Sequence, residues 1–391
     1  MKDEKKAPKL RFKVFTDDWE QCKLGDVANR FDNLRVPVTA NLRKNGNTPY
    51  YGANGIQDFV DGYTHDGEYI LVAEDGANNL KNYPINYVSG RIWVNNHAHV
   101  LQAIPDLANT RFLGYEIGRS NIVSLLVGGG RAKLNADALM NMSINLPKMQ
   151  EQELIAKIFK TIDHAITLHE EKKRQLERFK SALLQKMFAD KSGYPVVRFK
   201  GFSVEWVQRK LGKITDVRDG THSSPHYVNN GYPLLTSKNV NNGRINYDGV
   251  NYISKYDYTQ INKRSKVDVN DILMGMIGTI GNLAIIQEKP NFAIKNVALI
   301  KHTGSIDSQF LFHNLQTDHI TNELSSSMDG GTQRFVSLKQ IRNLLIVLPM
   351  LDEQAYIGTT FQIVDAIITL HNQKLRLLRR IKQSLLQKMF I

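Results

Sequence analysis

The sequence has a single cysteine, Cys22, among 391 residues. One cysteine cannot form a disulfide within the chain, and it excludes a zinc site built from several cysteines. No apolar run approaches the ~20 residues that a membrane-spanning helix requires. The segment from Met1 to Lys6 is rich in charge and lacks the apolar core of a secretion signal. We therefore expect a cytoplasmic protein with no membrane partner.

Motifs of nucleotide chemistry are also missing. The chain has no Gly-x-x-x-x-Gly-Lys-Ser/Thr loop for a nucleoside triphosphate. No two prolines are adjacent, which excludes the Asn/Asp-Pro-Pro-aromatic loop of amino-methyltransferases. Gly275, Gly278 and Gly281 are spaced by three, unlike the dinucleotide fingerprint. They indicate either a tight turn at a strand end or a loop that approaches phosphate.

What the chain does contain is a long internal repeat. One copy runs from Leu146 to Phe188 and the other from Leu348 to Phe390, without a gap between them in the alignment. Both begin Leu-Pro-x-x-x-Glu-Gln and end Leu-Leu-Gln-Lys-Met-Phe. A lead-in with Arg-Phe-Lys, Trp and Lys-Leu-Gly also occurs twice, beginning at Arg11 and Arg198. The repeated unit is therefore a whole module.

Each copy of the long repeat is predicted to be one helix. Its apolar residues recur three and four apart, which is heptad spacing, and residues 147–190 contain a leading proline and no glycine. About forty residues make a helix of roughly 60 Å. Such a narrow apolar seam favours pairing of each helix with the other copy. The alternative is that each helix packs only on its own domain. The predicted helix-pairing residues are Ile155, Phe159, Ile162, Ile166, His169, Leu176 and Leu183, and Ile357, Phe361, Val364, Ile368, His371, Leu378 and Leu385.

The equivalent residues His169 and His371 favour an antiparallel pair. Each lies near the middle of its helix, where a twofold axis would bring the two together as a buried polar pair that fixes the register. A metal site there is the lesser alternative.

The predicted fold class is α+β, with two globular mixed α/β domains separated by two long helices in an antiparallel coiled coil, and a pseudo-twofold internal repeat. The expected divisions are a first domain at residues 1–146, a spacer helix at 147–190, a second domain at 191–348 and a second spacer helix at 349–391. Strands are expected at Tyr69–Ala73, Arg91–Val94 and Asp271–Met274, and short helices near Asn135–Met140 and Leu338–Asn343.

Net charge is +13, with 51 basic and 38 acidic residues, which indicates a polyanionic partner. The charge is uneven. Residues 1–146 carry 17 basic and 16 acidic residues, whereas residues 191–348 carry 19 and 12. Charge alone would therefore not identify the first domain as a nucleic-acid binder.

The two globular segments share their ends but differ in between, which indicates one architecture with two binding surfaces. Arg and Lys read guanine, Asn and Gln read adenine, and several of these types also contact phosphate. Taken singly, each such residue is more often a solvated loop side chain, but clusters favour DNA contact. The predicted DNA-binding residues of the first domain are Arg35, Arg43, Lys44, Asn45, Asn47, Tyr50, Tyr51, Asn54, Arg91, Asn95, Asn96, His97 and Arg131. Those of the second domain are Arg218, Thr221, His222, Ser237, Lys238, Asn239, Arg244, Thr279, Gln333 and Arg334.

Alternatives stay open for two pairs in the first domain. His97 and His99 alternate on a strand, so one of them is as readily a core residue as a DNA contact. Tyr50 and Tyr51 either contact DNA or pack beneath their loop.

Several motifs together resemble the specificity subunits of type I restriction-modification systems. They are the Trp-x-x-x-Lys-Leu-Gly lead-in, Tyr-Tyr-Gly-Ala-Asn-Gly at Tyr50–Gly55, Asp219-Gly220-Thr221-His222, and the Leu-Pro-x-x-x-Glu-Gln start of each helix. The resemblance covers essentially the whole chain. It implies two target-recognition domains, each reading one half of a bipartite site in double-stranded DNA, with the helices as spacer and docking platform.

The resemblance also implies a non-catalytic chain without metal or cofactor, S-adenosylmethionine being bound by a partner. Two equivalent modules predict two copies of the modification (methyltransferase) subunit. Whether restriction or translocase subunits join the complex is left open. A spacer of ~60 Å limits the half-site separation to roughly 18 base pairs at ~3.4 Å each, and about one helical turn is favoured.

Two other functions remain open at this point. One is a self-contained DNA methyltransferase or nuclease with an unrecognised site, which binding of S-adenosylmethionine by the isolated chain would indicate. The other is a coiled-coil adaptor that binds only protein.

Overall fold

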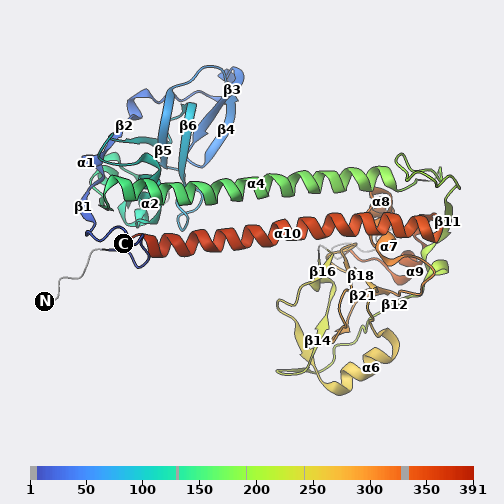
Figure 1. The fold of residues 1–391 in the computed structure, drawn as a ribbon. Coiled ribbons are helices and arrows are strands. Elements are labelled where there is room, and N and C mark those ends of the chain that lie inside the picture. Colours follow the sequence, from blue (N-terminus) through green and yellow to red (C-terminus); the bar gives the residue numbers. More distant parts are fainter. Residues whose placement is uncertain (1–6, 129–131, 191, 242, 327–333) are drawn as a thin grey trace. The chain divides into compact units, whose positions relative to one another are not determined.

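The computed structural model of the chain describes residues 7–128, 132–190, 192–241, 243–326 and 334–391 (Figure 1). The chain forms two compact units. Unit 1 comprises Met1–His169 and Lys374–Ile391, and unit 2 comprises Glu170–Gln373. Each unit thus combines one globular segment with helical segments from both copies of the repeat. The four domain limits expected from the sequence stay a prediction. Among the described helices, none is both long and apolar enough to span a membrane.

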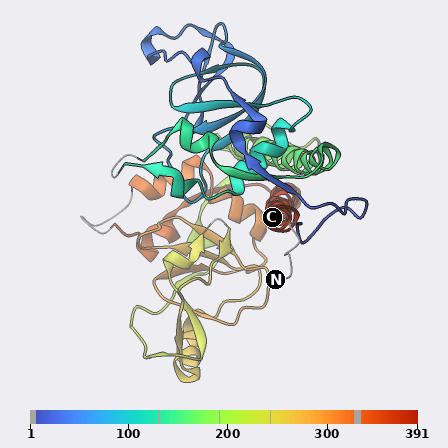
Figure 2. The same ribbon diagram turned by 90° about the vertical axis from the view of Figure 1, so that its left-hand side faces the viewer.

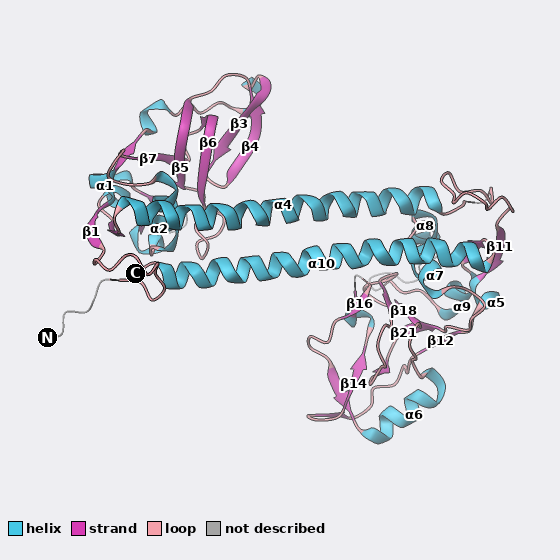
Figure 3. Cartoon of the chain, viewed as in Figure 1, coloured by secondary structure: helices cyan, strands magenta, loops and turns pink. Residues whose placement is uncertain are grey.

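Unit 1 is built on a six-stranded sheet (Figure 3). Its strands, in spatial order, are β2 (Ala28–Arg30), β7 (Ala98–Ala103), β5 (His65–Ala73), β6 (Ile85–Val94), β3 (Asn45–Gly52) and β4 (Gly55–Val60). Neighbouring strands are antiparallel except β3 and β6, which are parallel.

The C-terminal half of strand β5 is buried on both faces of this sheet. Successive side chains of a strand point to opposite faces. Ile70 and Val72 belong to the main core with Phe112 of helix α2 (Thr110–Arg119), whereas Tyr69 and Leu71 belong to a separate apolar cluster. The strands expected at Tyr69–Ala73 and Arg91–Val94 are confirmed.

Short elements complete unit 1. They are β1 (Glu20–Lys23), α1 (Leu24–Val27), η1 (Asp32–Leu34), η2 (Ala40–Leu42), η3 (Ile122–Leu125), β8 (Leu126–Val127), β9 (Lys133–Leu134), α3 (Ala136–Met140) and β10 (Ser143–Leu146). Helix α3 confirms the short helix expected at Asn135–Met140.

Unit 2 carries two four-stranded sheets where unit 1 has one sheet of six strands. The first is β12 (Val217–Asp219), β21 (Val297–Ile300), β18 (Ile272–Gly275) and β19 (Leu283–Ile285), and the second is β13 (Tyr227–Val228), β17 (Asn251–Ile253), β14 (Tyr232–Leu235) and β20 (Ala293–Ile294). Its other elements are β11 (Val207–Lys210), α5 (Leu211–Ile214), η4 (Ser237–Asn239), β15 (Val240–Asn241), β16 (Arg244–Ile245), α6 (Lys255–Ser265), α7 (Ser308–Asn314), α8 (Asp318–Ser326), α9 (Leu338–Asn343) and β22 (Leu345–Leu348). The expected strand at Asp271–Met274 and helix at Leu338–Asn343 are confirmed.

The two long helices are α4 (Met149–Met187) and α10 (Leu351–Met389), each of 39 residues. Within unit 1, Lys382 near the end of α10 pairs with Asp163 in the first half of α4, with 2.6 Å between Nζ and Oδ1. Within unit 2, Lys180 near the end of α4 pairs with Asp365 in the first half of α10 at 2.7 Å. The helices are therefore antiparallel, as predicted.

The end of each long helix fills the core of the unit formed by the other repeat. Phe390, which follows α10, contacts Phe112 and Phe159 in unit 1, with ring centroids 5.2 and 5.8 Å apart. Phe188, which follows α4, contacts Phe310 and Phe361 in unit 2 at 5.3 and 5.5 Å. The repeated Met-Phe ending therefore supplies core residues to both units.

The repeated motifs at the start of each helix have the same contacts in both units. Glu151 accepts two hydrogen bonds from Arg11 at 2.8 and 2.7 Å, and Glu353 accepts two from Arg198, both at 2.8 Å. Bidentate Arg–carboxylate pairs such as these fix geometry as well as charge. They attach the lead-in segment to the first turn of each long helix.

The repeated glutamines satisfy backbone groups in the same way. Gln152 donates to the Pro147 carbonyl and accepts from the Asn109 amide, each at 2.9 Å. Gln354 donates to the Pro349 carbonyl at 2.8 Å and accepts from the Asp307 amide at 2.9 Å. Strand β1 also pairs with β10, and β11 with β22, in equivalent register. The same frame thus encloses different sheet arrangements in the two units.

Candidate nucleic-acid interface

The predicted DNA-binding residues of the first domain differ in exposure. Tyr50 and Asn95 are buried, and Arg131 lies outside the described residues. Half-buried positions are Arg35, Arg43, Tyr51 and His97, and exposed positions are Lys44, Asn45, Asn47, Asn54, Arg91 and Asn96. Of these predicted residues, only the exposed ones have side chains that are largely accessible to a ligand in this conformation.

Several of these side chains already have partners inside unit 1. Arg43 pairs with Asp58 at 3.2 Å and lies over the Tyr50 ring, whose hydroxyl accepts from the Val38 amide. Asn54 bridges two loops by donating to the Gly76 carbonyl and accepting from the Asn78 amide, each at 2.9 Å. Tyr50 therefore packs beneath its loop, which was one of its two alternatives.

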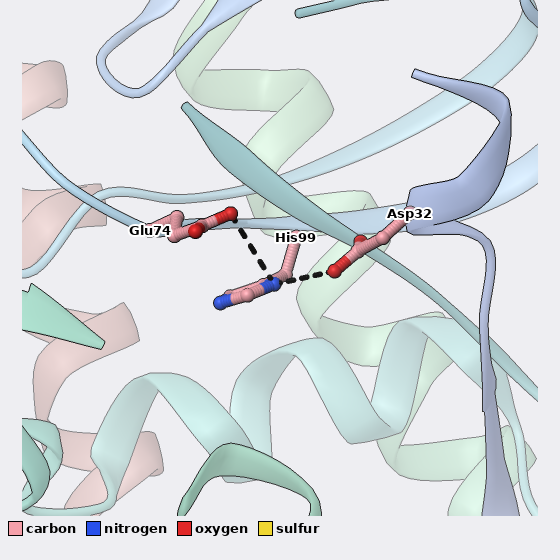
Figure 4. A group of neighbouring side chains, drawn as sticks. All are labelled: Asp32, Glu74 and His99. Carbon is pink, nitrogen blue, oxygen red and sulfur yellow. Dashed lines mark hydrogen bonds and ion pairs between the residues drawn. The ribbon is translucent and has the colours of Figure 1, made fainter. Parts of the chain in front are cut away.

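Arg35 belongs to an ionic cluster formed by Asp32, Glu74 and His99 (Figure 4). His99 Nδ1 lies 2.6 Å from Asp32 and 3.8 Å from Glu74, while its Nε2 faces the Leu134 carbonyl at 2.9 Å. These three side chains have the spacing of metal ligands. However, Arg35 and Lys133 already pair with Glu74 at 2.7 and 2.9 Å. The positive charges of these two side chains would repel a metal ion. The cluster therefore fits a network of salt bridges better than a metal site.

The ionised form of Asp32 is favoured in this cluster. Burial by itself would raise the pKa of Asp32, but hydrogen bonds from His99 and the Val100 amide, with the charge of Arg35, outweigh burial and lower it below the ordinary value of 3.8. The cluster joins η1 to strand β7 and to Glu74, which directly follows β5. His99 is accordingly a core residue, while the neighbouring His97 is half-exposed and pairs with Asp75.

In unit 2, the predicted segment Asp219-Gly220-Thr221-His222 begins at the last residue of strand β12. A Cβ on Gly220 would lie 2.2 Å from the Ile294 carbonyl oxygen, so only glycine lets the loop approach β20 this closely. Thr221 exchanges backbone hydrogen bonds with Ile294 and Asn296, at 3.0 and 3.1 Å. The glycine therefore places the loop against the segment that contains Asn296.

His222 bridges two polar side chains on this surface. Its Nδ1 lies 2.8 Å from Asn296 Oδ1 and its Nε2 lies 2.7 Å from Asp219 Oδ2. Hydrogen bonds to Asn296 and Asp219 raise the pKa of His222 above its ordinary value of 6.5. Asn296 has a φ of 53°, a backbone conformation that a residue with a side chain rarely adopts. Strained residues of this kind are often found at functional sites.

Two adjoining hollows share Asp219. The first, of about 360 Å³, has a mainly apolar lining that includes Met276, Ile277, Phe335 and Val336, with Asp219, His222, Asn296 and Ser337 as its polar members. The second, of about 470 Å³, is lined by Arg218, Asp219, Lys263, Arg264 and Arg342. We call them the apolar cleft and the basic hollow. The apolar cleft offers a surface that suits nucleic-acid bases, and the basic hollow offers one that suits phosphates.

The other predicted DNA-binding residues of the second domain are placed unevenly. Ser237 and Asn239 are buried, Arg218 and Thr221 are half-buried, and Gln333 lies outside the described residues. Exposed positions are His222, Lys238, Arg244, Thr279 and Arg334. Ser237 donates to the Asn296 carbonyl and accepts from the Met276 amide, and Asn239 closes a turn with Thr236. Their side chains therefore support the surface from inside.

The three spaced glycines form a tight turn. A Cβ on Gly275 would lie 2.3 Å from the Thr279 carbonyl oxygen, and Gly278 and Gly281 have positive φ values of 74° and 77°. Thr279 donates its hydroxyl hydrogen to the Ser237 carbonyl at 2.7 Å. The turn interpretation is confirmed, and contact of this loop with phosphate stays a prediction.

The model of the type I restriction modification DNA specificity domain matches the chain twice, at residues 16–178 and 203–380. The chain belongs to this family. It is similar to a type I restriction enzyme specificity subunit of Haemophilus influenzae, with 31% identity over 89% of this chain and 87% of the relative. It is also similar to the MjaVIII specificity subunit of Methanocaldococcus jannaschii, with 22% identity over 95% of this chain and 91% of that one.

The fold of this specificity subunit is also found in a solved structure. The S subunit of the type I system from M. genitalium aligns with a TM-score of 0.73, over 98% of this chain and 99% of that chain, at 16% identity. With the family, this likeness confirms the predicted fold class. The chain is the DNA-recognition subunit of a type I restriction-modification system and not a catalytic subunit.

The predicted helix-pairing residues of the specificity subunit are all at least partly buried. Buried positions are Ile155, Phe159, Ile357, Phe361 and Val364, and half-buried positions are Ile162, Ile166, His169, Leu176, Leu183, Ile368, His371, Leu378 and Leu385. Their role in pairing, and a meeting of His169 with His371, stay predictions.

Among the residues that line the hollows of the specificity subunit, sequence reasoning did not select Asn296, Lys263, Arg264 and Arg342. Asn296 is 74 residues from His222, so nothing local indicates their contact. Lys263 and Arg264 end α6, and Arg342 lies on α9. The excess of basic residues in 191–348 was the only sequence signal for Lys263, Arg264 and Arg342.

Proposed function

We propose that each globular segment of this specificity subunit reads one half of a bipartite site in double-stranded DNA. The observation that carries this proposal is the shared frame around different sheet arrangements in the two units. Equivalent lead-ins, strand pairs and helix starts enclose a six-stranded sheet in unit 1 and two four-stranded sheets in unit 2. A repeated frame that encloses two dissimilar domains suits recognition of two different DNA sequences.

The exposed polar residues are the best candidates for direct contact with DNA. In the first domain these are the exposed side chains of β3 and its flanking loops, such as Lys44, Asn45 and Asn47. In the second domain they are His222 at the apolar cleft and Lys238 on η4, and the half-buried Asn296 lies beside His222. Asn side chains can make two hydrogen bonds to adenine in the major groove.

The long helices are proposed to carry two copies of a methyltransferase subunit. Tyr356, Ile363, Leu370 and Leu377 follow one another at seven-residue spacing along α10, and each is about half exposed, between 49% and 60%. This row is separate from the buried residues of α10, which include Ile357, Phe361 and Val364. Exposed heptad rows are the surfaces onto which further helices pack.

The first repeat has equivalent exposed positions, which supports two docking sites. Leu168 corresponds to Leu370, and the two side chains are 53% and 49% exposed. Phe179 corresponds to Ile381, at 52% and 40% exposure. The two proposed docking sites thus share part of their apolar surface.

The chemistry of methylation is assigned to the partner. The chain is proposed to hold no cofactor, and S-adenosylmethionine to be bound by the methyltransferase subunit, which would flip the target adenine out of each half-site. Restriction or translocase subunits are possible further partners. A cytoplasmic location, where such a complex meets DNA, belongs to the same proposal.

A domain exchange tests the proposed function. The chain is coexpressed with its cognate modification subunit, and methylated adenines are mapped by sequencing. Replacing residues 1–146 with those of another specificity subunit should change one half of the methylated motif, and replacing 191–348 should change the other half. A motif that changed in both halves after either exchange would contradict the proposal.

A further inference from the structure

The basic hollow of unit 2 is built from three separate elements. Helix α6, drawn yellow in Figures 1 and 2, supplies Lys263 and Arg264 from its last turn. Strand β12 supplies Arg218, and helix α9 supplies Arg342. Arg342 donates two hydrogen bonds to the Val217 carbonyl, at 3.0 and 2.6 Å, which hold its guanidinium at the hollow.

Charge in this hollow is far from balanced. Four basic residues line it and Asp219 is its single acidic lining residue. Arg264 pairs with that Asp219 and also donates to the Gly220 carbonyl, and Arg218 pairs with Asp216 at 2.6 Å. Lys263 is exposed and donates to the neutral side chain of Gln260 at 2.9 Å. Even with Asp216 counted, an excess of positive charge remains for an anionic ligand.

The first domain offers a contrast. The predicted DNA-binding arginines that the structure describes in this domain are paired with acids, Arg35 with Glu74, Arg43 with Asp58 and Arg91 with Asp66. Its residues 1–146 are almost neutral in total, whereas residues 191–348 carry seven more basic than acidic residues. Affinity for a polyanion should therefore be concentrated in the second domain.

We infer that the basic hollow binds a phosphate of the DNA backbone and orients the duplex for reading at the adjoining apolar cleft. Asp219 lines both hollows, so a phosphate held by Lys263 and Arg264 lies beside His222 and Asn296. Phosphate contacts of this kind set position and register, while base edges carry sequence information. This inference rests on the DNA-binding role proposed above.

The test compares variants in the complex with the modification subunit. Binding of a cognate and a non-cognate duplex is measured by fluorescence anisotropy at several salt concentrations. Each phosphate contact contributes about 0.9 to the slope of log K against log salt. Lys263→Gln should lower that slope by about this amount and weaken both duplexes by the same factor. Lys263→Arg should retain the wild-type slope.

Lys255→Gln is the matched control, because it removes the same charge from the first turn of the same helix, outside the basic hollow. It should leave the slope unchanged. A wild-type slope for both Lys263→Gln and Arg264→Gln, with unchanged melting temperature, would overturn the inference. So would a loss confined to the cognate duplex, since that indicates base reading. A wild-type complex that retained no DNA would instead refute the proposed function.

Discussion

At the scale of single residues, the stability of the first domain depends on polar side chains that pair with one another inside it more than on its exposed polar side chains. Arg35, Asp32, Glu74 and His99 satisfy one another inside unit 1. Removing one member of such a cluster leaves another charge without its partner, which costs more than the net worth of the pair. The main role of these residues is therefore to stabilise unit 1, and not to contact DNA.

Asp32→Asn should reduce the acid sensitivity of unit 1. Because the folded state lowers the pKa of Asp32, its ionised form stabilises the fold above the ordinary value of 3.8, and this contribution is lost as pH falls through the folded pKa. The variant should be less stable at pH 7 and show a smaller fall in unfolding free energy between pH 5 and pH 3. Denaturant titrations at several pH values measure this. The exposed Asp61→Asn, as control, should keep the wild-type pH dependence.

Phe390→Ala should destabilise unit 1 and Phe188→Ala should destabilise unit 2. Removing a buried Phe side chain costs about 3–5 kcal/mol, and each ring contacts aromatic core residues of the stated unit. Hydrogen exchange with mass spectrometry should show faster exchange of β5 in the first variant and of β18 in the second. Equal effects of each variant on both strands would contradict this assignment.

At the scale of elements, each long helix has two apolar faces with different uses. Ile357, Phe361 and Val364 of α10 are buried, whereas Ile363 and Leu370 are about half exposed. Tyr356, at the start of the same heptad row, packs against Phe199 and Phe202. The exposed surface of Ile363 and Leu370 is available for contact with a partner.

Leu370→Asp should weaken binding of the modification subunit at one docking site without unfolding the chain. A charge in a desolvated helix–helix contact is costly, so we expect at least a tenfold loss, measured by titration in analytical ultracentrifugation. Combining it with Leu168→Asp should remove both copies. Gln383→Asp, at about 140° from Leu370 around α10, is the control and should retain two. Two bound copies in the double variant would rule out this surface.

At the scale of the whole molecule, α4 and α10 are proposed to set the distance between half-sites. Seven residues keep the heptad phase, so an insertion near Lys173 in α4 and a matching one near Asn372 in α10 should lengthen the pair by ~10 Å. The spacer in the methylated motif should then grow by about three base pairs at ~3.4 Å each. Methylome sequencing that returned the original spacer would contradict the proposal.

Much of the frame was predictable because its signals are local or repeated. Heptad spacing and the absence of glycine in residues 147–190 indicated a long helix, and α4 runs from Met149 to Met187. The sheets were less predictable, since β-strands such as β3 and β6 pair across long stretches of sequence. Of the candidate site, the Asp219–His222 loop was found from its motif, but Asn296 and Arg342 were not.

The sequence by itself determined the duplication, the length of the two helices and the existence of an apolar seam, because helical periodicity and repeated motifs are properties of neighbouring residues. Only the tertiary structure decided which polar residues are satisfied internally and which remain exposed. Ser237 and Asn239 lie within the same run of polar residues as Lys238, yet only Lys238 is exposed. Burial and pairing depend on contacts between distant segments, and the chain's topology sets those contacts.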